Sequence, residues 1–76
     1  MLQEFERVAL QEDLPEHGLK AGDIATIVDI HQNGKGYTLE FVSLGGKTIA
    51  IVTVFAAQVR PLEQDEVPHA RKLEPS

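Results

Sequence analysis

The 76-residue sequence contains no cysteine. This absence excludes a disulfide framework and a zinc ribbon, so the hydrophobic core has to supply the stability of the fold. The sequence also has no run approaching the roughly 18 consecutive apolar residues that a membrane helix needs. The first ten residues carry Glu4 and Glu6 where a signal peptide would need positive charge. We therefore expect a cytoplasmic protein without a membrane partner.

Basic residues are scarce, because twelve acidic side chains stand against seven basic ones and the net charge is -5. Such a surface repels a phosphate backbone on average, which makes a nucleic-acid partner unlikely. Lys20, Lys35, Lys47 and Arg60 are scattered along the chain. Aromatic residues that could stack on bases are few, and most lie at expected core positions or strand ends: Phe5, Tyr37, Phe41 and Phe55.

The most informative stretch covers residues 13–30, where a polar loop rich in glycine and proline leads into a β-branched segment. Isoleucine and valine favour a pleated surface, and glycine and proline mark the ends of strands. Asn33-Gly34 and Gly45-Gly46 each predict a hairpin turn. The sequence as a whole predicts five strands, near residues 5–10, 23–31, 37–42, 47–54 and 59–62, with a single 3₁₀ turn over residues 55–58.

These elements predict an all-β domain over residues 1–62, a small five-stranded SH3-like antiparallel barrel. An OB-type barrel is the main alternative, but residues 43–46 leave no room for its usual helix. Pro61 cannot donate to a ladder, so the last strand should lie at an edge or end at this residue. Residues 63–76 are charged and should form a flexible polar tail, with a helical turn near residues 67–73. The predicted core comprises Val8, Leu10, Leu19, Ile24, Val28, Leu39, Phe41, Ile51 and Val59.

Several segments together resemble an uncharacterised bacterial family, domain of unknown function 4926. They are DLPEHGLKAGD (residues 13–23), the following IATIVDI, the YTLEFV and GGKTIAIVTV strands, and the closing QVRPL. Ala25 stands where the family pattern would have glycine. The resemblance implies no catalytic residue. It implies a short protein that works with a neighbour-encoded partner.

A looser similarity links residues 20–23, Lys-Ala-Gly-Asp, to the KOW type of SH3-like module, which often contacts ribosomal RNA or transcription machinery. The similarity implies a nucleic-acid or ribosome-associated module as the alternative function. Such binding needs basic residues, whereas Glu12, Asp13 and Glu16 make this loop acidic. The nucleic-acid interpretation is therefore the weaker of the two.

No catalytic constellation is visible. His17 with Glu16 and Asp13 is a candidate loop metal site, but an ordinary solvated loop explains these residues as well. His31 and His69 are expected at the surface and in the tail, and Ser43 has no histidine in its sequence context. The glycine pairs precede no helix, so they are turns rather than phosphate cradles. We expect no enzyme activity, no metal and no cofactor.

The strand near residues 47–54 is apolar on both faces, although one face of a strand in a small antiparallel barrel normally meets water. Ile49, Ile51 and Phe55 form one face, and Ala50, Val52 and Val54 form the other. Another part of the chain could cover the second face. The alternative, which gives the predicted site, is that Ala50, Val52 and Val54, or their opposites, bind another protein or a second copy. The predicted function is a non-catalytic protein-binding module.

Overall fold

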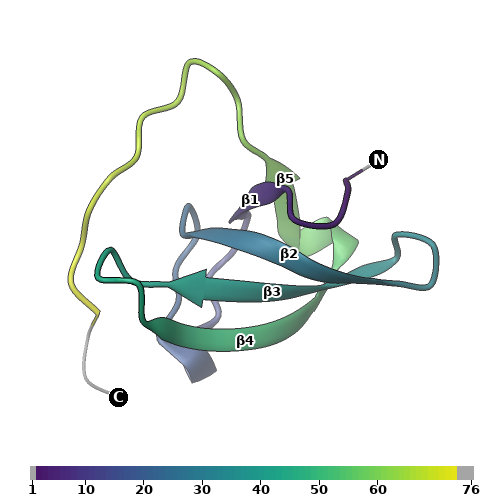
Figure 1. Ribbon diagram of the computed structural model, residues 1–76, viewed down its shortest axis with the longest axis horizontal. Helices are drawn as coiled ribbons and strands as arrows, with labels where there is room; N and C mark the ends of the chain where they lie inside the picture. Colours follow the sequence, from purple (N-terminus) through teal and green to yellow (C-terminus); the bar gives the residue numbers. More distant parts are fainter. Residues whose placement is uncertain (1, 74–76) are drawn as a thin grey trace.

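The computed structural model describes residues 2–73. Residue 1 of the predicted domain and residues 74–76 of the predicted tail lie outside the described residues. The sheet has five antiparallel strands in the order β4-β3-β2-β1-β5 (Figure 1). The strands are β1 (Arg7–Leu10), β2 (Ile24–His31), β3 (Gly36–Val42), β4 (Thr48–Phe55) and β5 (Val59–Pro61). Two 3₁₀ turns, η1 (Pro15–His17) and η2 (Ala56–Gln58), complete the order, and residues 2–73 contain no α-helix.

Both predicted hairpin turns are confirmed. Between β2 and β3, Asn33 and Gly34 have positive φ angles of 60° and 93°, which explains why the Asn-Gly pair stands there. The turn closes through the Gly34 N–H, which donates to the His31 carbonyl at 3.1 Å. Between β3 and β4, the Gly46 N–H donates to the Ser43 carbonyl at 2.9 Å.

The core lies on one face of the curved sheet. The alternation predicted for β3 is confirmed, because Tyr37, Leu39 and Phe41 are all buried. Side chains from β4 and β5, the two edges of the sheet, belong to the same buried cluster, so the sheet must curve around it (Figure 1). Six predicted core residues are confirmed as buried: Val8, Leu10, Leu19, Leu39, Phe41 and Val59.

Three predicted core residues are wrong: Ile24, Val28 and Ile51. Ile24 pairs with Ala9 on the outer face and is 38% exposed, while its neighbour Ala25 faces the core. Val28 is half-buried, at a register shift between β2 and β3. A strand's side chains alternate between faces, so an offset of one residue is enough to exchange inside and outside. Ile51 is 63% exposed, on the outer face of β4.

The first strand is shorter than predicted, because β1 begins at Arg7. Phe5, predicted as the first residue of this strand, is instead 71% exposed and adopts a positive φ of 68°. Its N–H still donates to the Ile27 carbonyl, at 2.6 Å. A residue with left-handed backbone angles cannot continue a strand, and this accounts for the later start of β1.

The loop over residues 11–22 is anchored by two buried leucines, of which Leu19 was predicted in the core. Leu14 and Leu19 pair with each other as an isolated antiparallel bridge, with N–H to carbonyl distances of 2.9 and 3.2 Å. The bridge closes the chain around η1 and leaves the polar side chains of that turn in solvent. The loop therefore contributes apolar contacts to the core despite its polar composition.

The tail differs from the prediction, because residues 67–73 form no helical turn. The chain leaves β5, swings out in a wide arc and returns past the other end of the sheet (Figure 1). Near its end, the Arg71 guanidinium forms an ion pair with Asp23, the residue just before β2, and donates to the Gly18 carbonyl at 3.3 Å. The described part of the tail is thus attached to the domain at a point remote in sequence.

Candidate functional site

β4 is the feature that stands out at the surface. It lies at one edge of the sheet and pairs only with β3. All eight of its residues, TIAIVTVF, are uncharged, and most are β-branched. Such a composition suits a strand that packs on both sides. The contacts of its two faces therefore decide what this strand can do.

The inner face of β4 belongs to the core. Val52 is 8% exposed and Val54 is 5% exposed, and half-buried Ala50 packs against the same cluster. The prediction that Ala50, Val52 and Val54 form an exposed surface is therefore wrong. The exposed side chains are those of their opposites, Ile51 at 63% and Phe55 at 76%.

A register shift explains which face turns inward. Val42 pairs with Thr48, but Phe41 pairs with Ala50, so Ile49 is an extra residue in β4. Without it, Leu39 would lie opposite Ile51, and residues directly opposite each other share a face of the sheet. The extra residue instead places Val52 opposite Leu39. The bulge thus buries Val52 and exposes Ile51.

A row of polar side chains borders the exposed residues on the outer face. The Thr38 and Thr53 hydroxyl oxygens are 3.0 Å apart, and His31 Nε2 lies 2.7 Å from Thr38 Oγ1. Further along, the Thr48 hydroxyl donates to Glu40 Oε2 at 2.7 Å. These contacts place His31 in an ordinary cross-strand hydrogen-bond row. The outer face therefore combines exposed apolar groups with satisfied polar ones.

The candidate metal residues of the loop are not brought together as a ligand set. The Asp13 carboxylate accepts a hydrogen bond from the Ala21 N–H at 2.9 Å, which fixes the loop, and His17 is exposed in η1. Among residues 2–73, no group of three or more histidine, aspartate or glutamate side chains could hold a metal ion. Asp13 therefore has a structural contact within the loop.

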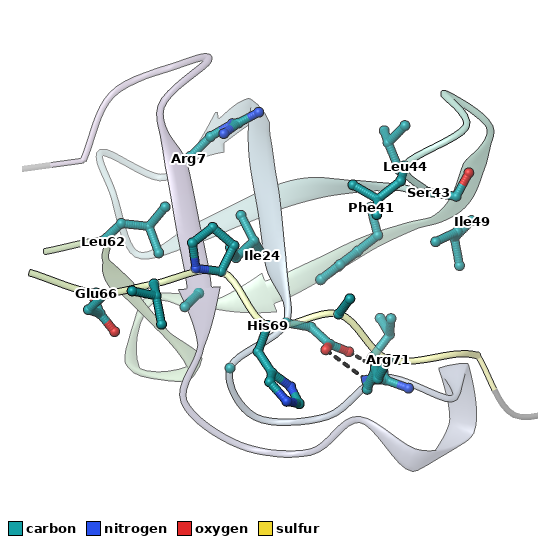
Figure 2. Close-up of a pocket in the computed structure, with 18 of the residues that line it drawn as sticks. Arg7, Ile24, Phe41, Ser43, Leu44, Ile49, Leu62, Glu66, His69 and Arg71 are labelled. Atoms are coloured by element: carbon teal, nitrogen blue, oxygen red, sulfur yellow. Dashed lines mark hydrogen bonds and ion pairs between the residues drawn. The ribbon is translucent and has the colours of Figure 1, made fainter. Parts of the chain in front are cut away.

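A cleft of about 780 Å³ lies between the tail and the sheet. Leu62 and Glu66 stand at one end, and Leu44 and Ile49 at the other (Figure 2). The ion pair of Arg71 closes the lower side, with both residues largely shielded from solvent. Sequence reasoning missed this cleft, because no periodic pattern in the tail indicates that it returns to the sheet.

A second ion pair fixes the start of the tail. The Arg60 guanidinium donates from Nη1 and Nη2 to the two Glu66 carboxylate oxygens, both at 2.7 Å. These hydrogen bonds, followed by one from the Glu63 N–H, lower the pKa of Glu66 from 4.5 to about 2. The same contact raises the pKa of Arg60. Both groups are exposed, so the pair positions the chain more than it stabilises the fold.

Comparison with known families identifies the family of this chain. The model of the domain of unknown function DUF4926 matches residues 4–61 of the chain. The chain belongs to this family. The matched residues of DUF4926 include all five strands, with the bulged β4, whereas the tail from residue 63 onward lies outside them.

No curated protein and no solved structure matches the chain. In the described part of this DUF4926 protein, no helix has the length and apolar character to cross a membrane. The chemistry of its own residues must therefore carry any argument about function.

Proposed function

We propose that this DUF4926 protein is a non-catalytic protein-binding module of the cytoplasm, built as an SH3-like barrel. Its partner is a neighbour-encoded protein, such as a toxin or an enzyme to which it is an accessory subunit, or a second copy of itself. The strand order supports the SH3-like assignment, since consecutive strands β1 to β4 are neighbours and η2 returns the chain to pair β5 with β1.

One observation carries the proposal. Ile51 and Phe55 expose most of their apolar side chains on the outer face of an uncharged edge strand. Removing apolar surface from water contributes roughly 25 cal/mol per Å². The threonine hydroxyl groups nearby already have hydrogen-bond partners within the chain. A partner that covered them would therefore not leave them without a hydrogen bond. This surface is therefore suited to association.

The test is affinity capture from the native host followed by mass spectrometry. Ile51→Lys places a charge in the middle of the exposed surface and should abolish capture of the specific partner. Val67→Lys is the matched control, because Val67 is also highly exposed but lies in the tail. If Ile51→Lys, folded by circular dichroism, still captures the same protein as the parent, the binding surface lies elsewhere and this assignment fails.

The alternative function, a KOW-like nucleic-acid or ribosome-associated module, makes the opposite prediction. Arg60 and Arg71 are both engaged with carboxylates, and the net charge is -5. We therefore expect weak binding to generic RNA or DNA at physiological salt. Fluorescence anisotropy at about 150 mM salt checks this expectation. Sub-micromolar affinity would support the alternative instead.

A further inference from the structure

The two edges of the sheet differ in how they are protected. β5 spans three residues and contains Arg60 and Pro61, which are features that discourage pairing with another strand. β4 spans eight residues and contains neither a charge nor a proline. Its bulge at Ile49 lies close to one end, so the stretch from Ala50 onward remains regular. An edge of this kind is a template for another strand.

The backbone of β4 shows which groups are directed outward. The Ala56 N–H donates across to the Lys35 carbonyl at 2.9 Å, so Ala56 directs its polar groups toward β3. In an antiparallel ladder this direction alternates along the strand. Val54 and Val52 therefore bond to β3, while Thr53 and Ile51 direct their N–H and C=O groups away from it. The residues with exposed side chains are thus those with outward backbone groups.

The two ends of this edge carry opposite charges. At the C-terminal end, the Phe55 N–H donates to Gln58 Oε1 at 2.7 Å, and Gln58 Nε2 donates to Glu12 Oε2 at 3.2 Å. This chain of contacts places the Glu12 carboxylate beside the end of the strand. At the N-terminal end, exposed Lys47 immediately precedes β4. An antiparallel pair of identical strands brings each lysine toward the glutamate of the other copy.

We propose that a second copy of this chain docks at this edge, with its β4 antiparallel to the first and the two-fold axis near residues 51–53. Outward groups of Ile51 and Thr53 then complete a ladder between copies, and each Lys47 lies near Glu12 of the second copy. A symmetric contact of this kind is closed, so it forms a dimer and not a filament. The inference rests on the proposed function and names its partner.

Sedimentation of the full chain over a range of concentrations tests the proposal. The parent and Val67→Lys should form dimers. Ile51→Lys should raise the dimer dissociation constant by about fivefold, because the two-fold axis near residues 51–53 brings the two introduced lysines close together on one face of the joined sheet, where like charges repel. Circular dichroism checks that each variant is folded. A parent that stays monomeric at every concentration overturns the inference, as does a folded Ile51→Lys that dimerises like the parent.

A charge exchange tests the same arrangement independently of Ile51. Glu12→Lys and Lys47→Glu should each weaken the dimer, and the double variant should restore it, because the two charges then meet again in exchanged positions. Equal dimerisation in all three variants would contradict the antiparallel arrangement.

The two failures are distinguishable. A monomeric parent whose capture of a different protein depends on Ile51 overturns the dimer but leaves the proposed function intact. A monomeric parent that captures no other protein through Ile51 would contradict both the dimer and the proposed function.

Discussion

The two faces of β4 carry similar apolar side chains but have different surroundings. Val52 and Val54 lie in the core, whereas Ile51 and Phe55 lie in solvent. The chemistry of valine and isoleucine does not determine which face of β4 is buried. The register with β3 determines it, because Val52 lies opposite Leu39. A strand that is apolar on both faces takes its inner face from its neighbour, and one inserted residue reverses the outcome.

The largest expected effect comes from placing a charge on each face of β4. Val52→Lys should unfold the domain, because a buried ammonium group without a partner has a high desolvation cost. Ile51→Lys should leave the monomer folded, since that side chain is mostly in solvent. Thermal melts followed by circular dichroism compare the two variants. A folded Val52→Lys would mean that the inner face had been assigned incorrectly.

A truncation in β3 should have a smaller effect of the same kind. Phe41 is buried in the cluster that receives Val52, so Phe41→Ala should lower the free energy of unfolding by about 3–5 kcal/mol. Val42, the next residue along, faces outward and is 47% exposed. Val42→Ala should change the free energy of unfolding by less than about 0.5 kcal/mol. Urea titration measures both, and equal losses would show that the contrast between faces does not extend to β3.

The smallest expected effect on stability is in the tail, where an exposed ion pair holds the chain and little apolar surface is buried. The lowered pKa of Glu66 means that its contribution to stability is present above pH 4.5 and is lost as the pH falls from 4.5 toward about 2. An NMR titration of the carboxyl group should therefore give a midpoint near 2 in the parent. Arg60→Gln should raise that midpoint toward 4.5. A parent midpoint already near 4.5 would show that the ion pair does not form in solution.

Much of the sheet could be predicted from the sequence, because its signals are local. Asn33-Gly34 specifies its turn through backbone angles, and the alternation of Tyr37, Leu39 and Phe41 specifies a strand with one buried face. The bulge at Ile49 could not be predicted in this way. It depends on how two strands fit against each other, and neither strand contains a residue that marks it.

The exposed apolar side chains of β4 were predicted on the wrong face of the strand. Their assignment to this strand followed from the uncharged sequence of β4, and the error followed from the unpredicted bulge. The cleft beneath the tail had no sequence signal at all. Arg71 reaches Asp23 only because the chain between them folds into the sheet, and such a contact between distant residues leaves no periodic pattern.

The pairing of β1 with β5 has a consequence for the order of folding. Ala9 lies opposite Arg60, so this pair joins the two ends of the domain, whereas β2, β3 and β4 are linked by short turns. Closing a long loop costs more chain entropy than closing a short one. We therefore expect the three central strands to form in the transition state and β5 to dock afterwards. In a chevron analysis, Leu39→Ala should mainly slow folding, and Val59→Ala should mainly accelerate unfolding. The reverse pattern would show that β1 and β5 pair before the three central strands are complete.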